Sequence, residues 1–494
     1  MARSEAAALV LYRRRPELEL YWIQRSDSLS YLGGFHAFPG GRISKRDREV
    51  AVRGLEPGPQ AALIACAARE VFEETGVLVC RGARRVPAER RDTFRRALLE
   101  DRIGLGEIMR DESLLLEGTD FVPAGRWISP PFTPGGFDTY FYLVELPDGE
   151  EPSIWPGELQ GGEWLRPAQG LAAWGANRAL LAAPVLYTLR ALARDPYAET
   201  AAWGRTLSAT PEAQGGHVPR IEVHPGFLLY PVRTPTIAPA THTNCLVIGG
   251  PEVVIVDPGS PYPEEQDALD RALDAVLTEG RTVRAIVVTH HHADHLGGVD
   301  RLRDRLAAPV WAHGFTAPFC RADRTLAGGE TIDLAADGGR RWALEVLHTP
   351  GHTPGHLALY ERESGTIVAG DLVSGLGTVV IDPPEGEMAA YLESLRRLLD
   401  LPATVILPGH GPPMGGAADR LRFYLEHRAW REGRILEALA AGPRRLEEIV
   451  PPVYDDTPPE RHGLAARSTL AHLLKLRAES RVEEAEPGLW RRLP

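Results

Sequence analysis

The alternation of apolar and polar residues changes character along the chain. In the N-terminal part, the apolar runs at residues 6–12 and 137–145 predict β-strands. Residues 61–75 combine apolar and charged positions with a helical period and predict a helix. A second, Ala- and Leu-rich helix is predicted at 179–193, interrupted or restarted at Pro184, because proline cannot donate the backbone hydrogen bond of a helix interior.

Residues 195–217 are small and polar without a clear period, so we expect a linker there and a domain boundary near residue 205. Beyond the boundary, strand-like apolar runs alternate with helical stretches such as 264–277 and 388–401. This alternation is typical of an α/β domain. The strand-like runs read NCLVIGG, EVVIVDPG, VRAIVVTH, TIVAGDLV and ATVILPGH.

The C-terminal tail has a third pattern. After Pro412 the sequence predicts two or three short amphipathic helices, and the following RVEEAEPGLWRRL predicts a small two-stranded wing. With 494 residues at about 150 per domain, roughly three domains are expected. We therefore predict a multidomain chain of mixed α/β and α+β class. Its predicted domains are 1–205, 206–418 and 419–494.

The composition excludes several classes of protein. With 44% hydrophobic and 25% charged residues, the chain is neither disordered nor fibrous. We find no apolar run near the roughly 18 residues that a membrane helix needs, so we expect neither a membrane span nor a signal peptide. Four cysteines without a C-x-x-C pair argue against a disulfide framework or a thiolate zinc site and favour the cytoplasm. Any metal ligands are therefore histidines and carboxylates.

The charge distribution bears on the kind of partner. A formal net charge of −12 argues against a general nucleic-acid binder. From Arg420 to the end, 14 Lys and Arg stand against 12 Asp and Glu. The tail is therefore the least unfavourable segment for contact with nucleic acid.

The helix predicted at 61–75 places three carboxylates on one face. Glu70, Glu73 and Glu74 stand at positions i, i+3 and i+4. Like charges so placed repel unless divalent cations lie between them, and oxygen ligands suit Mg²⁺ or Mn²⁺ bridging a diphosphate. An isolated cluster of this kind is more often a solvated helix face. Here, however, FPGG at 38–41 precedes the helix as a predicted turn and Gly76 ends it.

Together, FPGG and REVFEETGV resemble the Nudix hydrolase signature G-x5-E-x7-R-E-U-x-E-E-x-G-U, where U is apolar. The resemblance implies an α/β/α sandwich that splits a nucleoside diphosphate derivative. It also implies that Glu70, Glu73 and Glu74 bind Mg²⁺ or Mn²⁺. One carboxylate, Glu73 or Glu74, or a metal-bound water would act as the base.

The spacing departs from this signature. Between Gly41 and Arg69 lie 27 residues instead of 13, so the first signature Glu falls at Asp47 when counted forward and at Ala61 when counted back. Similar insertions occur in a branch that resembles coenzyme A diphosphatases. RSDSLSYLGGFHAFPGG is similar to that branch's R-S-x3-R-x3-G-x3-F-P-G-G, except that Ser30 replaces the second Arg. The implied substrates therefore include, but are not limited to, coenzyme A-like diphosphates.

A second cluster of chemically active residues follows the strand-like runs of the middle domain. Histidines and aspartates gathered at the ends of strands form a rigid cup, as a catalytic metal site requires. Two Zn²⁺ ions held there would lower the pKa of water to ~7 and make it a nucleophile. A single histidine in such a turn would more often be a structural hydrogen-bonding group. The cluster, however, comprises His290, His292, Asp294, His295, His352, Asp371 and His410.

Residues 218–412 thereby resemble the metallo-β-lactamase superfamily, through H-x-H-x-D-H and the later turns HTPGHTPGH, AGDLV and PGHGP. The resemblance implies an αββα sandwich with two zinc ions. His291, His348 and His356 match no ligand position, so we interpret them as loop or supporting residues. The implied ligands are His290, His292 and His352 for one zinc, Asp294, His295 and His410 for the other, and Asp371 as the bridge, with Asp294 and Asp371 as the catalytic carboxylates.

Two branches of this superfamily are excluded by the residues present. True β-lactamases typically lack the bridging aspartate that Asp371 supplies, and only 38 residues separate it from His410, too few for the inserted domain of β-CASP nucleases. Two compact branches remain. THHHADHLGG and TPGHTPGH resemble glyoxalase II-like thioesterases, and the tail resembles the winged helix of a compact endoribonuclease family.

The function of the tail is left open by the sequence. Leu464, Leu470, Leu473, Leu474 and Leu476 supply most of its apolar helix surface, whereas Arg461, Arg467, Lys475 and Arg477 are candidates for contact with phosphates. A clamp for single-stranded RNA and a structural support are equally consistent with this pattern.

From the two motif resemblances together, we predict a bifunctional hydrolase, a Nudix diphosphatase joined to a zinc-dependent thioester or ester hydrolase. An endoribonuclease is the alternative for the second half, and a ligand-sensing or scaffolding module is a third reading.

Overall fold

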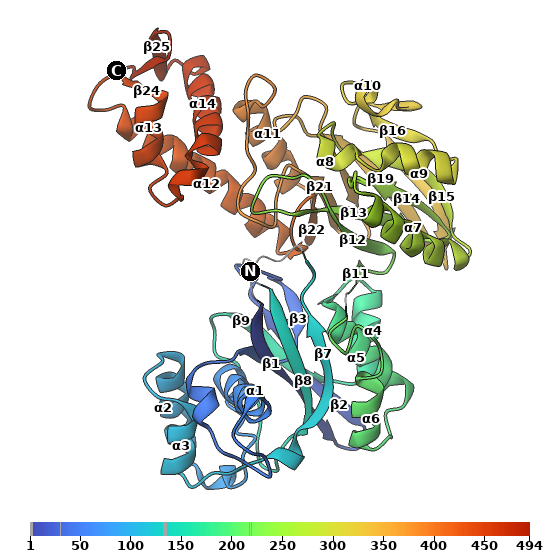
Figure 1. The fold of residues 1–494 in the computed structure, drawn as a ribbon, viewed down its shortest axis with the longest axis vertical. Helices are drawn as coiled ribbons and strands as arrows, with labels where there is room; N and C mark the ends of the chain where they lie inside the picture. Colours follow the sequence, from blue (N-terminus) through green and yellow to red (C-terminus); the bar gives the residue numbers. More distant parts are fainter. Residues whose placement is uncertain (1–2, 30, 132–135, 217, 219) are drawn as a thin grey trace. The chain divides into compact units, whose positions relative to one another are not determined.

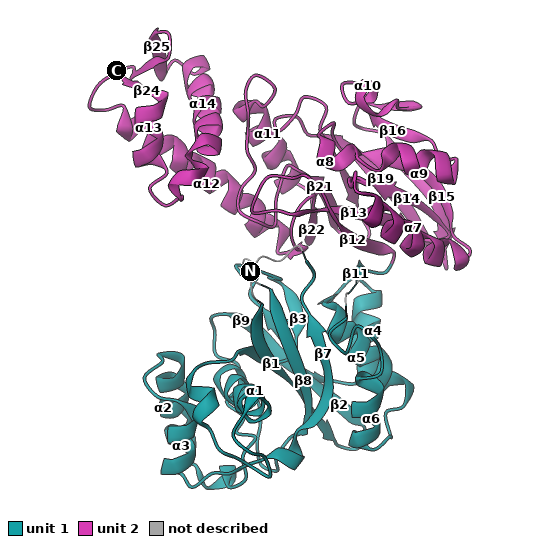
Figure 2. Ribbon diagram, in the orientation of Figure 1, with its two compact units in different colours: residues 1–225 teal, residues 226–494 magenta. Residues whose placement is uncertain are grey.

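The computed structural model describes residues 3–29, 31–131, 136–216, 218 and 220–494 (Figure 1). Ser30 and His217, which enter the sequence predictions, lie outside the described residues. The chain divides into two compact units, Met1–Pro225 and Gly226–Pro494 (Figure 2). Within the described ranges, no helix has the length and apolar character needed to cross a membrane. All four cysteines are free and buried, so none takes part in a disulfide.

Unit 1 is built on a mixed eight-stranded sheet. Its central strand β1 (Ser4–Arg14) runs parallel to β8 (Phe137–Glu145) and antiparallel to β2 (Leu18–Arg25). Seven consecutive residues of β1 are buried, because both faces of the sheet are covered. The strand order is β10-β3-β2-β1-β8-β7, with β4 beside β1 and β9 beside β2. The remaining bounds are β3 (Phe35–Ala37), β4 (Gly40–Arg42), β7 (Val122–Ile128), β9 (Leu159–Leu165) and β10 (Leu180–Leu181), and β5 (Val52–Arg53) pairs separately with β6 (Leu116–Glu117).

Helices cover both faces of this sheet (Figure 1). Helix α1 (Pro59–Thr75) packs on β1, β4 and β8. It begins with a proline and ends at Gly76, whose positive φ of 73° suits a residue without a side chain, as predicted. The others are α2 (Ala88–Leu99) and α3 (Leu105–Asp111), and, on the opposite face, α4 (Pro167–Gly175), α5 (Ala183–Arg194) and α6 (Thr200–Leu207).

Three local predictions for unit 1 need correction. Residues 200–207 of the predicted linker form α6, which packs on β7 through buried Trp203 and Leu207. A helix of eight residues is too short to show its period in the sequence. The predicted boundary near residue 205 therefore falls inside a helix, and the compact unit extends to Pro225. Of the helix predicted at 179–193, the first part forms β10, and Gly40–Arg42, predicted as a turn, forms β4.

Unit 2 contains two mixed sheets packed face to face. Strands β12 to β17 pair in sequence order, and so do β18 to β23. Backbone hydrogen bonds connect the sheets directly, from the amide of Asn244 to the carbonyl of Gly409 and from Leu357 to Thr289, both at 2.8 Å. The strands are β12 (Phe227–Arg233), β13 (His242–Gly249), β14 (Glu252–Val256), β15 (Thr282–Val288), β16 (Val310–His313), β17 (Arg324–Leu326), β18 (Thr331–Asp337), β19 (Arg340–His348), β20 (Leu357–Glu361), β21 (Thr366–Gly370), β22 (Val405–Pro408) and β23 (Met414–Gly415).

The outer faces of the two sheets carry helices. Val247 and Ile255 on the first sheet belong to one core with residues of α7 (Pro263–Thr278) and α9 (Val299–Leu306). Tyr360 and Ile367 on the second sheet belong to a core with α11 (Met388–Leu399) and α12 (Ala417–Ala438). Because strand side chains alternate, the intervening buried residues face the other sheet. The predicted αββα sandwich is confirmed. Its helices are α7 (Pro263–Thr278), α8 (Ala293–Leu296), α9 (Val299–Leu306), α10 (Ala317–Cys320) and α11 (Met388–Leu399).

The C-terminal segment folds as helices with a small sheet. It comprises α12 (Ala417–Ala438), α13 (Leu446–Val453) and α14 (His462–Ala478). Strands β24 (Arg444–Arg445), β26 (Leu489–Arg492) and β25 (Val482–Glu486) pair in that order. The wing therefore has three strands rather than two, and α12 has 22 residues rather than being short.

Ion pairs connect two of these helices. Glu432 of α12 lies 2.7 Å from Lys475 Nζ of α14 and 2.6 Å from Arg481 Nη1. Burial alone would raise the pKa of Glu432, but the nearby His472 and the hydrogen bond from Lys475 lower it from 4.5 to about 2. Such a carboxylate stabilises the fold above its unfolded pKa and loses this effect as the pH falls through its folded pKa.

We therefore expect the wild type to have a higher free energy of unfolding than Glu432→Gln. The difference should be largest above about pH 4.5 and should vanish as the pH approaches about 2. Thermal unfolding measured across this range tests the prediction. A difference that stays constant with pH would contradict the assigned role of Glu432.

Candidate metal centre

The seven ligand-type residues predicted in unit 2 converge at one end of the two sheets. His290 and His292 follow β15, Asp371 follows β21 and His410 follows β22, so that each lies where a strand ends. His352 lies in the turn between β19 and β20. Asp294 and His295 lie on the short helix α8 that follows the turn after β15, so that this segment and the three other turns bring the seven residues together.

Three imidazoles form the first group. Nδ1 of His292 lies 3.1 Å from Nε2 of His290 and 3.1 Å from Nε2 of His352. Burial lowers the pKa of all three rings, that of His352 to about 4. Neutral rings with converging nitrogens are suited to donate lone pairs to a cation.

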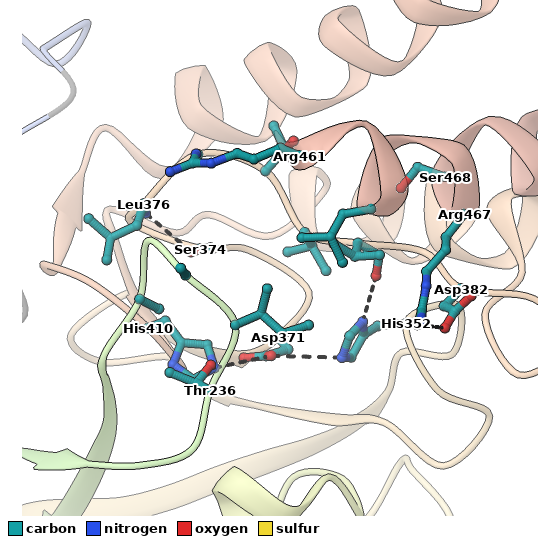
Figure 3. A pocket seen from close by; sticks show the side chains of 18 of the residues that line it. Thr236, His352, Asp371, Ser374, Leu376, Asp382, His410, Arg461, Arg467 and Ser468 are labelled. Atoms are coloured by element: carbon teal, nitrogen blue, oxygen red, sulfur yellow. Dashed lines mark hydrogen bonds and ion pairs between the residues drawn. The ribbon is translucent and has the colours of Figure 1, made fainter. Parts of the chain in front are cut away.

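The second group combines carboxylates and imidazoles. Asp294 Oδ2 lies 3.4 Å from His410 Nε2. Asp371 reaches both groups, with Oδ1 at 3.4 Å from His295 Nε2 and Oδ2 at 3.3 Å from His410 Nε2 and 3.7 Å from His352 Nε2. Figure 3 shows Asp371 between His352 and His410. Asp371 is therefore in contact with histidines of both groups.

The donor set of this site fits metal ions. Nε2 of His295 and Oδ1 of Asp371 are buried and lack a hydrogen-bond partner among the described residues, which is costly unless a cation satisfies them. Burial alone would lower the pKa of His410, but Asp371 and Asp294 raise it to about 10. Protons must therefore leave this group when a metal binds, because a ligand imidazole is neutral.

The ligand-type rings are oriented by neighbours that the sequence analysis did not identify. Asp257 Oδ2 lies 2.8 Å from His295 Nδ1 and accepts a hydrogen bond of 2.6 Å from Thr289. Backbone carbonyls of Val380 and His242 lie 3.0 and 2.8 Å from Nδ1 of His352 and His410. Each contact leaves Nε2 directed at the cluster. The signal for Asp257 was its place directly after the strand in IVDPG.

Replacement of Asp257 by Ala is expected to weaken zinc binding about 10- to 100-fold, because His295 loses the acceptor that fixes its ring. Zinc affinity measured by competition with a chromophoric chelator tests this. Asp333→Ala, at an exposed pair with Arg341, serves as the control. Equal affinities of both variants would show that Asp257 does not support the centre.

The three histidines interpreted as loop or supporting residues take such places. His356 Nε2 accepts the backbone N–H of Asp371 at 3.0 Å, and its Nδ1 contacts Thr349 at 2.8 Å. His291 lies 2.7 Å from Glu385. His348 Nε2 lies 2.8 Å from the carbonyl of Pro354. His356 therefore helps to place the backbone of the bridging aspartate.

A cavity of about 570 Å³ opens over this cluster. Its floor includes His292, Asp294 and Asp371, and one wall is formed by the loop at 235–240. The opposite wall comes from the C-terminal segment, including Arg428 of α12. The C-terminal segment is therefore part of the cavity wall rather than a remote appendage.

The carboxylates predicted in unit 1 lie on α1 as expected. Glu74 Oε2 accepts the backbone N–H of Gly40 at 3.1 Å. Gly41 lies against Glu70, so closely that a Cβ atom at this position would clash with its carboxylate. Burial raises the pKa of Glu70 to about 7, and it also raises the pKa of Glu73 and Glu74.

Arg69 organises this face of α1. It lies 2.8 Å from Glu70 and 3.0 Å from Glu73. It also makes two hydrogen bonds of 2.9 and 3.0 Å to buried Asp47. Of the two candidates for the first signature Glu, Asp47 thus joins the cluster, whereas Ala61 carries no ligand atom.

The two units differ in how closely their ligand atoms gather. In the part of the chain that the structure describes, all groups of three or more ligand atoms within 4.8 Å lie in unit 2. Glu70, Glu73 and Glu74 do not form such a group. The predicted Mg²⁺ or Mn²⁺ site is therefore not supported by a close convergence of ligand atoms in the described structure.

Comparison with known proteins agrees with the division of unit 2. The profile of the Metallo-beta-lactamase superfamily matches residues 238–410, and that of the Beta-lactamase associated winged helix domain matches 446–490. A Beta-lactamase-like protein 2 homolog of Caenorhabditis elegans is 32% identical over 231 residues, which cover 44% of this chain and 72% of that protein. A hydroxyacylglutathione hydrolase of Methylobacillus flagellatus is 33% identical over 189 residues, 38% of this chain and 68% of that protein.

One solved structure of another class is also similar to part of the chain. The NUDIX hydrolase from Alicyclobacillus acidocaldarius is 26% identical, with a TM-score of 0.37, over 43% of this chain and 99% of that one.

Proposed function

The chain belongs to the metallo-β-lactamase superfamily of metal-dependent hydrolases, and from this premise we propose that unit 2 hydrolyses a thioester or related ester of a small molecule. The observation that carries the proposal is the position of Asp371, which contacts both groups of ligand-type residues at the floor of a cavity of small-molecule size. The similarity to a hydroxyacylglutathione hydrolase supports an acyl substrate.

The side chains have separate tasks in this proposal. His290, His292 and His352 would hold one zinc ion, Asp294, His295 and His410 would hold the other, and Asp371 lies within reach of both groups. When bound, zinc at this site would supply Lewis-acid chemistry and a nucleophilic water of lowered pKa.

The surrounding residues hold and shield this arrangement. Asp257 and the carbonyls of Val380 and His242 keep the imidazoles directed inward. Apolar side chains of the wall, Ile237, Leu376 and Val379, receive the acyl group and exclude bulk water. The carboxylates of Asp294 and Asp371 would balance part of the charge of cations bound there.

Cleavage of single-stranded RNA is the competing function. The presence of the winged helix in the cavity wall favours it. Three of the four basic residues considered for phosphate contact are paired, however. Arg467 contacts Asp382 at 2.5 Å, Lys475 contacts Glu432 at 2.7 Å and Arg477 contacts Glu484 at 3.4 Å. Because these three basic side chains are already paired with carboxylates, they are poorly placed to bind RNA phosphates. This favours a small ester as the substrate.

The two functions are separated by offering the zinc-loaded chain acyl thioesters and single-stranded RNA side by side at 50 and 200 mM salt. We expect thioester turnover with little dependence on salt. RNA cleavage that falls steeply with salt would instead establish the nuclease, because phosphate contacts release counterions.

For unit 1 we propose a Nudix-type diphosphatase that uses Glu70, Glu73 and Glu74 with Mg²⁺ or Mn²⁺ on a nucleoside diphosphate derivative. The proposal is supported by the close approach of the Gly40–Gly41 backbone to these carboxylates and by the Arg69 cluster. Oxygen ligands of this kind suit Mg²⁺, although their atoms do not gather as closely as in unit 2.

The variant Glu73→Gln is expected to lower Mg²⁺-dependent diphosphatase turnover at least ~100-fold, because it removes one ligand charge beside Arg69. The control is the zinc content of the same variant, which should equal that of the wild type. Unchanged turnover on a panel of nucleoside diphosphate derivatives would refute the assignment.

A further inference from the structure

The wall that the C-terminal segment contributes to the cavity carries four arginines in two different electrostatic states. Arg431 makes two hydrogen bonds of 2.8 Å to Asp456, and Arg467 contacts Asp382 at 2.5 Å. Arg428 and Arg461 also line the cavity, but neither has a carboxylate within 4.0 Å in the described ranges. Two positive charges of this wall are therefore uncompensated.

Arg428 is the buried member of the pair, with only 2% of its surface exposed. Its guanidinium donates to the carbonyl of Val379 and lies 5.2 Å from the ring of Tyr391. Its Nε has no partner among the described residues. A buried cation without an anion costs free energy, which an anionic ligand would offset.

Arg461 is the exposed member and precedes α14. Figure 3 shows its side chain extended across the cavity toward Ser374 and Leu376. Its guanidinium can therefore meet a ligand that enters above the metal centre. An exposed guanidinium is solvated in the free protein and becomes a strong hydrogen-bond donor when an anion displaces water.

The acidic residues of the cavity do not cancel these two charges. Asp294 and Asp371 face the metal centre, Asp382 is taken by Arg467, and Glu385 lies 2.7 Å from His291. The end of the cavity next to the winged helix is thus positive, whereas its floor is a site for metal ions.

We propose that Arg428 and Arg461 bind an anionic group of the substrate, a carboxylate or a phosphate, carried on the part remote from the scissile bond. This inference rests on the proposed ester hydrolysis and specifies its substrate class: unit 2 prefers negatively charged thioesters or esters. The winged helix then acts as a specificity element for a small anionic molecule.

The test compares three acetyl thioesters in the zinc-loaded full-length chain. They are S-acetyl-3-mercaptopropionate, its neutral methyl ester, and S-acetyl-2-mercaptoethyl phosphate. The wild type is expected to prefer one or both anionic compounds, and the preferred one identifies the anion. In Arg461→Gln the ratio of kcat/KM for the anionic and neutral thioesters should fall about 10-fold, mainly through KM, as expected for a lost charge-assisted hydrogen bond.

Two further variants keep the test interpretable. Arg428→Lys retains the charge in case Arg428→Gln does not fold, and should lose less of the preference than Arg461→Gln. Arg422→Gln, at an exposed pair with Asp419 on the same helix α12, should leave the ratio unchanged. A ratio that is the same in Arg461→Gln and in the wild type would overturn the proposal.

Direct binding separates this inference from the proposed function. Calorimetry with succinate and with inorganic phosphate needs no turnover, and Arg461→Gln should weaken at least one of them about 5-fold or more. If no thioester is hydrolysed but binding is weakened in this way, the anion site stands and the proposed reaction fails. If the variant binds both anions as the wild type does, the anion site is refuted whatever the turnover.

Discussion

Replacement of Asp371 by Asn is expected to lower kcat/KM for thioester hydrolysis at least about 10³-fold. Asp371 is the one residue that reaches His295, His352 and His410 within 3.7 Å in the described structure. The amide keeps the shape of the side chain but removes the negative charge between the two groups of ligand-type residues. Steady-state kinetics on the zinc-loaded chain measures the effect.

A matched control comes from the same cavity. Asp382 lines it but contacts Arg467 instead of the histidines, so Asp382→Asn should retain hydrolysis within about 5-fold. If Asp371→Asn kept more than a tenth of the wild-type activity, Asp371 would have no bridging role.

The second large effect is expected in unit 1, where Asp47→Ala should lower the free energy of unfolding by about 3–5 kcal/mol. Asp47 is 1% exposed and accepts two hydrogen bonds from Arg69, which is itself almost buried. Its removal leaves the guanidinium without its main anionic partner. Removal of one partner of a buried ion pair lowers the free energy of unfolding far more than replacement of both partners by well-packed apolar residues.

Denaturant unfolding of the full chain measures this change. The unfolding of unit 1 is recognised as the transition during which the hydrolytic activity of unit 2 does not change. Asp148→Ala removes an ion pair with Arg84 in which both side chains are exposed, so it should have a much smaller effect. Equal destabilisation by the two variants would contradict the role assigned to Asp47.

The sequence allowed the prediction of the αββα sandwich because its strands are continuous apolar runs ending in polar turns. β15 and β21 are examples, and the turns after them carry His290 and Asp371. Local patterns sufficed here because His290, Asp371 and His410 each follow the end of a strand within two residues. The same reasoning predicted α1 and its end at Gly76.

Long-range pairing was beyond the reach of local patterns. Lys475 and Glu432 are 43 positions apart and meet only because α12 packs on α14, so Lys475 appeared available for phosphate. Arg428 was not identified as a candidate for binding from the sequence, yet it lines the cavity. Its place there depends on α12 being a single long helix. Asp257 was missed because its partner His295 lies 38 positions away.

The most direct test of the central claim is thioester turnover measured while zinc is titrated into the chelator-treated full-length chain. We expect no activity without zinc and a rise to a plateau at two zinc ions per chain, since two groups of ligand-type residues share Asp371. Absence of turnover at every ratio would contradict the account, and a chain that binds fewer than two zinc ions would contradict it and favour a sensing or scaffolding role.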